Sequence, residues 1–148
     1  MTSRCRILQG ETRMGQKTKK RILLGKLGLD AHDNGLVIVA KWLSDAGYEV
    51  VYLGFYNFPE HLIEVALQED VDAIGISFLG GEHLYYTRQL TDLMKEKQIH
   101  DIRLILGGVI PPHDVDELKR LGVSEVFTPG TPRETIIEAL DNLFKEGG

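Results

Sequence analysis

Two periodicities of apolar residues alternate along the chain after about residue 20. Short strand-like runs, several of them rich in Val and Ile, alternate with helical patterns, and the first, third and fourth runs are almost continuously apolar, as is typical of strands covered on both faces of a sheet. These runs fall at 21–25, 49–53, 71–77, 102–107 and 125–128. Between them, apolar residues recur every three or four positions, which predicts amphipathic helices. The helical stretches begin near Leu36, Pro59, Tyr86, Pro111 and Thr131.

Five strand–helix units in succession predict an α/β fold in which helices cover both faces of a parallel sheet. We expect a flavodoxin-like (Rossmann-like), doubly wound sheet of five parallel strands in the order 2-1-3-4-5. No repeat or linker interrupts residues 21–146, so we assign them to one domain. For residues 1–20 we expect a basic, flexible tail.

Charge is distributed unevenly along the chain. Residues 1–21 carry seven Lys or Arg and one acid, whereas the remainder carries ten Lys or Arg and twenty-one acids. An acidic domain argues against a nucleic-acid surface, and the basic tail could either solubilise the chain or dock on a partner. No apolar run reaches the roughly 20 residues that cross a bilayer. The single cysteine, Cys5, allows no internal disulfide, so we expect a cytoplasmic protein without a membrane partner.

The loops after the first, third, fourth and fifth strands would gather at one edge of the sheet. Open α/β sheets bind their ligands at this edge. The loops span 26–35, 78–82, 108–110 and 129–131. Three of them contain closely spaced glycines, which allow a ligand to approach the backbone. We therefore expect a large bound molecule here.

Common ligands of this fold find no matching motif at that edge. The first loop has Gly25 and Gly28, but neither the dinucleotide pattern G-x-G-x-x-G nor the phosphate-binding G-K-[ST]. It also lacks the Ser or Thr residues that a flavin phosphate site would require. A phospho-acceptor receiver domain would need Asp at the position of Ser77 and Lys near Thr128.

His32 has the clearest chemistry in the first loop. Asp30 lies two positions before it and can accept one ring N–H, which leaves the other ring nitrogen available to a metal. Lys26 lies four positions before Asp30 and can favour its charged form. A zinc site would need three or four protein ligands, and the other histidines show no such spacing. A single protein ligand suits a metal that a macrocycle already holds.

The same residues resemble the motifs of cobalamin-binding domains. Asp30–Gly35 matches D-x-H-x-x-G, Ser77–Leu79 matches S-x-L, and Gly107–Gly108 matches the paired glycine after the fourth strand. Residues 107–112 and 127–131 are similar to the subgroup of methylmalonyl-CoA mutase and related acyl-CoA mutases. The resemblance extends from about residue 20 to residue 143.

The resemblance implies that His32 is the lower axial ligand of cobalt, oriented by Asp30 with Lys26 behind it. These three residues would be the catalytic set. Other positions would line the channel for the nucleotide tail of the cofactor or contact the corrin. The implied cofactor contacts are Ala31, His32, Asp33, Asn34, Gly35, Ser77, Leu79, Gly80, Gly107, Gly108, Val109, Phe127, Pro129, Gly130 and Thr131. The chain departs from the family in three places, since Ala31 replaces a common Gly, Asn34 replaces a common Arg, and the loop 80–83 after the S-x-L motif differs.

The resemblance also implies adenosylcobalamin as the cofactor and a radical rearrangement of an acyl-CoA carbon skeleton. Nothing in the chain resembles a substrate barrel, so we expect a small subunit that is active only with a large acyl-CoA mutase subunit, and we allow for a weak homodimer. Tyr85, Tyr86 and the basic tail are candidates for the partner face. Two alternatives remain open: a corrinoid protein that carries methyl groups for a methyltransferase, and a cobalamin-dependent sensor.

Overall fold

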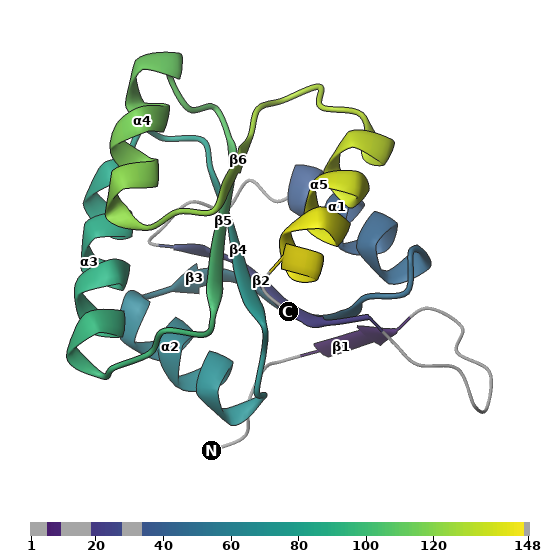
Figure 1. Cartoon of the computed structure of the whole chain (residues 1–148), viewed down its shortest axis with the longest axis horizontal. Helices are drawn as coiled ribbons and strands as arrows, with labels where there is room; N and C mark the ends of the chain where they lie inside the picture. Colours follow the sequence, from purple (N-terminus) through teal and green to yellow (C-terminus); the bar gives the residue numbers. More distant parts are fainter. Residues whose placement is uncertain (1–5, 10–18, 28–33, 147–148) are drawn as a thin grey trace.

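The computed structural model describes residues 6–9, 19–27 and 34–146. Its centre is a six-stranded sheet in the order β1-β3-β2-β4-β5-β6, with α1 and α5 on one face and α2, α3 and α4 on the other (Figure 1). The elements in chain order are β1 Arg6–Gln9, β2 Arg21–Leu27, α1 Asn34–Asp45, β3 Glu49–Asn57, α2 Pro59–Gln68, β4 Ala73–Phe78, α3 His83–Glu96, β5 Arg103–Gly108, α4 Pro112–Leu121, β6 Glu125–Phe127 and α5 Arg133–Glu146.

Strands β2 to β6 are the five strands predicted from the sequence, and they pair in parallel. Their spatial order is β3-β2-β4-β5-β6, which is 2-1-3-4-5 when they are numbered among themselves. The predicted flavodoxin-like fold is therefore confirmed. None of the described helices is long and apolar enough to cross a membrane.

Strand β1 was not predicted. It lies within the stretch 1–20, for which we expected a flexible tail, and pairs antiparallel with β3 from Arg6↔Tyr52 to Gln9↔Glu49. Its four residues include only two apolar ones, too few for a recognisable pattern. The outer edge of β3 supplies the backbone partners that such a segment needs. The sheet therefore has an antiparallel sixth strand beside the five parallel ones.

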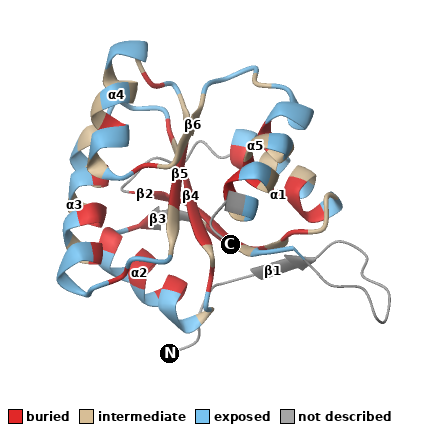
Figure 2. Ribbon diagram, viewed as in Figure 1, coloured by how far each residue is buried: buried red, intermediate tan, exposed pale blue. Residues whose placement is uncertain are grey.

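Two apolar clusters pack on the two faces of the sheet. One, beneath α2, α3 and α4, contains the fully buried Leu62 and Leu90, and the other, beneath α1 and α5, contains Leu43. Strand β2 contributes Leu23 to the first cluster and Leu24 to the second. Because both faces of the central strands are covered (Figure 2), these strands are almost continuously apolar in sequence.

Two strands run further than the sequence predicted. We expected them to end near residues 25 and 53, but β2 continues to Leu27 and β3 to Asn57. Gly54, at φ +83°, lies where the register between β2 and β3 shifts. An irregularity of this kind bends the strand and re-aims side chains without ending the pairing. Lys26 consequently lies on β2, and not in the loop to which we assigned it.

Candidate functional site

The candidate site lies at the edge of the sheet where the parallel strands end. Four strands terminate there, β2 at Leu27, β4 at Phe78, β5 at Gly108 and β6 at Phe127. The predicted ligand residues that the structure describes lie in the last residues of these strands or in the segments that follow them. The fold thus places this described part of the set at one edge, as the sequence predicted.

Ser77, Gly107 and Phe127 form a row across three neighbouring strands. In the register of the sheet, Ser77 pairs with Gly107, and Gly107 pairs with Phe127. Aligned residues of parallel strands point to the same face. Phe127 packs against the cluster beneath α1 and α5, so the row lies on that face. Two of its three side chains are small, which leaves room beside the strands.

Lys26 joins this row from β2. Its side chain is fully buried, and its Nζ donates a 3.3 Å hydrogen bond to the Ser77 carbonyl. A buried ammonium group requires oxygen partners of this kind. The contact fixes the end of β2, which precedes the D-x-H-x-x-G segment, to the end of β4, where the S-x-L segment begins.

Asn57 belongs to the same edge, although the sequence analysis missed it. It is buried at the end of β3, and its Nδ2 donates 3.0 Å hydrogen bonds to the carbonyls of Lys26 and Gly54. The first bond joins β3 to β2 at the register shift, and the second lies within β3. In the sequence, Asn57 precedes Phe58 and Pro59 and has the character of an ordinary turn residue, so only the strand register reveals it.

Gly108 marks the closest backbone approach at this edge. Its φ is +108°, and a Cβ atom there would lie 2.0 Å from the Phe78 carbonyl oxygen. The next residue, Val109, donates its N–H to the same carbonyl at 2.9 Å. The segments after β4 and β5 therefore touch through their backbones, and only glycine fits between them.

Several predicted ligand positions are accessible. Leu79 is 42% exposed and Val109 is 54% exposed, so the tips of two loops present apolar side chains. At Gly35, near the start of α1, an added Cβ would meet no described atom within 4 Å. The accessible apolar surface at Leu79 and Val109 fits a large ligand that is partly apolar.

The turn after β6 is organised by Thr131. Its hydroxyl donates a 2.6 Å hydrogen bond to the Thr128 carbonyl, and its N–H donates to the same oxygen at 3.2 Å. Pro129 and Gly130 are exposed beside it. Among the described residues, no hydrogen bond joins this turn to the rest of the candidate set.

The first loop itself lies outside the described residues. This applies to Asp30, Ala31, His32 and Asp33, and to the side chain of Asn34. The relay from Lys26 through Asp30 to His32 therefore stays a prediction, although the structure describes the elements on either side of the loop, β2 and α1.

A cavity at the opposite edge of the sheet contains none of the predicted ligand residues. Its volume is about 580 Å³, and Lys19, Tyr48 and Asp141 contribute to its wall. The Tyr48 hydroxyl donates to the Asp141 carboxylate. Burial, and then this contact, raise the pKa of Tyr48 above its ordinary value. The Lys19 Nζ atom lies 3.1 Å from the Asp141 Oδ1 atom. The polar groups of Lys19, Tyr48 and Asp141 are therefore paired with one another.

The chain matches the family of B12 binding domains over residues 20–137. It is 40% identical over 132 residues to the small subunit of 2-hydroxyisobutanoyl-CoA mutase from Aquincola tertiaricarbonis, an alignment that covers 89% of this chain and 97% of that protein. It is 38% identical over 123 residues to the small subunit of pivalyl-CoA mutase from Xanthobacter autotrophicus, covering 83% of this chain and 82% of that protein.

Among solved structures, a cobalamin-binding protein from Desulfitobacterium hafniense superposes on the chain with a TM-score of 0.72. The two share 21% sequence identity, and the match covers 84% of this chain and 59% of that one. At this level of identity the similarity concerns the fold alone.

Proposed function

Because the chain belongs to the family of B12-binding domains, we propose that it is the cobalamin-binding small subunit of an adenosylcobalamin-dependent acyl-CoA mutase, with His32 as the lower axial ligand of cobalt. One observation carries this proposal. The chain aligns along 97% and 82% of two proteins that are named as small subunits of acyl-CoA mutases.

The described residues fit such a cofactor. Ser77 and Gly107 offer the small side chains that a threaded nucleotide tail requires, on the face that α1 and α5 cover. Leu79 and Val109 offer accessible apolar surface at the loop tips. Lys26 is buried at the base of the first loop, where it would support Asp30 and, through it, the orientation of the His32 imidazole.

When bound, adenosylcobalamin supplies an adenosyl radical by homolysis of its cobalt–carbon bond. The residues of this chain would hold the corrin, orient the axial imidazole and keep water from the lower face. Substrate binding would belong to a large acyl-CoA mutase subunit, which we propose as the partner. The acyl-CoA that is rearranged would then be selected by that partner.

Titration of the purified chain with hydroxocobalamin tests the axial role. We expect the wild-type complex to show a base-off, His-on absorption spectrum. His32→Ala should abolish that spectrum and weaken binding at least about tenfold, since loss of a residue that only orients a metal ligand already costs that much. His61→Ala is the control, because His61 lies half exposed on α2. A wild-type spectrum with the benzimidazole still coordinated would contradict the proposal.

A pull-down from native extract tests the partner. We expect the chain to recover a large acyl-CoA mutase subunit. Recovery of a methyltransferase in its place would instead favour the corrinoid carrier.

A further inference from the structure

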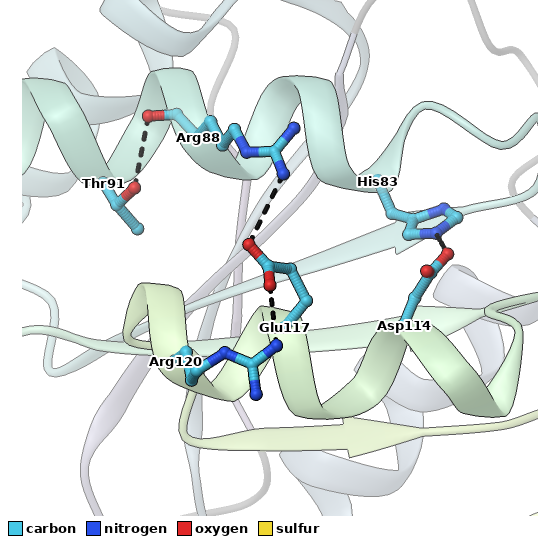
Figure 3. A network of polar contacts seen from close by, with 6 residues as sticks. All are labelled: His83, Arg88, Thr91, Asp114, Glu117 and Arg120. Carbon is cyan, nitrogen blue, oxygen red and sulfur yellow. Dashed lines mark hydrogen bonds and ion pairs between the residues drawn. The ribbon is translucent and has the colours of Figure 1, made fainter.

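We propose that His83, held by Asp114, is a positioning residue that fixes the two loops carrying predicted cofactor contacts after β4 and β5. His83 is the first residue of α3, and Asp114 lies in the first turn of α4. The His83 Nε2 atom lies 2.7 Å from the Asp114 Oδ2 atom (Figure 3). The inference rests on the proposed function, since it concerns how a bound cobalamin would be held.

The contact is shielded from water. The His83 side chain is 5% exposed and that of Asp114 is 19% exposed. A hydrogen bond to a carboxylate is stronger in such surroundings than at the surface, and breaking it leaves a buried polar group without a partner. The Phe78 ring packs edge-on against the His83 ring, with centroids 6.4 Å apart. The pair therefore also contacts the last residue of β4.

The same two loops are already joined where they begin. Val109 donates its N–H to the Phe78 carbonyl, so the ends of β4 and β5 are fixed to each other. The hydrogen bond between His83 and Asp114 joins the far ends of the two loops, where α3 and α4 start. The intervening residues include Leu79 and Gly80, which are predicted cofactor contacts. Each loop is thus anchored at both ends.

The second ring nitrogen of His83 supports this role. Nδ1 is buried without a hydrogen-bond partner among the described residues, as is the Thr87 hydroxyl one turn further along α3. Nδ1 lies on the side of the ring away from Asp114 (Figure 3). An unpaired buried polar atom is destabilising, so a histidine is a poor choice for packing alone. The hydrogen bond between Nε2 and Asp114 accounts for a histidine at this buried position.

A second pair joins the same helices one turn away from the loops. The Arg88 Nη2 atom lies 3.4 Å from the Glu117 Oε2 atom, and the other carboxylate oxygen of Glu117 accepts a hydrogen bond from Arg120. The side chains of Arg88 and Glu117 are 53% and 35% exposed. This pair connects α3 to α4 without reaching the loops (Figure 3), so it provides a matched control.

Substitutions at His83 can remove the imidazole ring and either keep or lose the hydrogen bond to Asp114. The amide nitrogen of Gln lies near the position of Nε2 and can still donate to Asp114, whereas that of Asn lies near Nδ1 and falls short. We expect H83Q to bind hydroxocobalamin within about threefold of wild type, and H83N and D114A to bind at least about tenfold more weakly. The control E117Q should bind like wild type. D114A keeps the test decisive if H83N does not fold.

Hydrogen exchange in the cofactor-free chain gives an independent measurement. Amides of residues 79–82 and 109–110 should exchange faster in H83N and D114A, and at the wild-type rate in H83Q and E117Q. Equal losses in H83Q and H83N, or the same loss in E117Q, would overturn the inference. If wild type binds no hydroxocobalamin, the proposed function fails, and the exchange rates still decide whether the pair fixes the loops.

Discussion

Gly108 and Gly122 have similar backbone conformations in different surroundings. Their φ angles are +108° and +120°. A Cβ at Gly108 would lie 2.0 Å from the Phe78 carbonyl oxygen, whereas one at Gly122 would meet nothing within 4 Å. Substitution of each glycine therefore separates the free-energy cost of a positive φ angle from the cost of a steric clash at the candidate site.

We expect Gly108→Ala to destabilise the protein more than Gly122→Ala. Both place alanine in the left-handed region, at a cost of about 1–2 kcal/mol. Only Gly108→Ala adds a clash with backbone, which costs roughly 1–3 kcal/mol more. Urea denaturation of the two variants measures the difference in free energy of unfolding. Equal losses would show that the backbones after β4 and β5 do not approach as closely as described.

At the scale of elements, Tyr48 and Asp141 connect the start of β3 to α5. Burial and the hydrogen bond to the Asp141 carboxylate raise the pKa of Tyr48 above 10.0. A group with a raised pKa in the folded state stabilises the fold fully below its unfolded pKa, and this contribution is lost as pH rises towards the folded value. The Tyr48 contact should therefore be complete at neutral pH and decline in alkali.

We expect Tyr48→Phe to lower the free energy of unfolding by about 1.5–3 kcal/mol at neutral pH, the range for a hydrogen bond to a charged group. The difference from wild type should shrink above a pH of about 10. Urea unfolding at both pH values measures it, with Tyr85→Phe as the control because Tyr85 is 61% exposed. A difference that grows in alkali would contradict the raised pKa.

Strands β2, β4 and β5 were predictable because burial on both faces imposes an almost continuous apolar run, and β3 and β6 because they alternate with amphipathic helices. Their ends were less predictable. Gly54 has the sequence character of a strand terminator, but its positive φ accommodates a register shift, and β3 continues past it. Strand β1 has no pattern of its own, since it exists through pairing with β3.

The candidate site likewise combines positions that the sequence predicts with contacts that it does not. That Ser77, Gly107 and Phe127 lie at one edge was predictable from their positions at the ends of predicted strands, since parallel strands bring such positions together, whereas their contacts with a cofactor come from the family resemblance and stay a prediction. The contact of His83 with Asp114 spans 31 residues and depends on how α3 packs beside α4. No local spacing encodes such a contact, and the bonds made by Asn57 likewise depend on the register of β2 with β3.

At the scale of the whole molecule, exposed apolar side chains gather around the edge where the parallel strands end. Phe58 follows β3, Leu79 follows β4 and Val109 follows β5, and all are more than two-fifths exposed. Tyr85, in the first turn of α3, is also exposed. Accessible apolar groups concentrated on one side are typical of a surface that a partner covers.

We expect Val109→Asp to weaken association with the proposed large subunit at least about tenfold, as loss of a central apolar contact does. Leu67→Asp is the matched control. Leu67 is 50% exposed, close to the 54% of Val109, but it lies near the end of α2, at the opposite edge of the sheet. Isothermal titration calorimetry with the large subunit measures both. Equal weakening would place the partner on another surface.

Among the described residues, the sheet ends on short strands at both sides. Strand β1 has four residues and β6 has three, and β1 pairs with Glu49–Tyr52, the first four of the nine residues of β3. A long unpaired strand is a template on which further chains can add, and two short ones offer little of it. A cell that makes this chain in excess of its partner should therefore keep the surplus dispersed, without growth of fibrils.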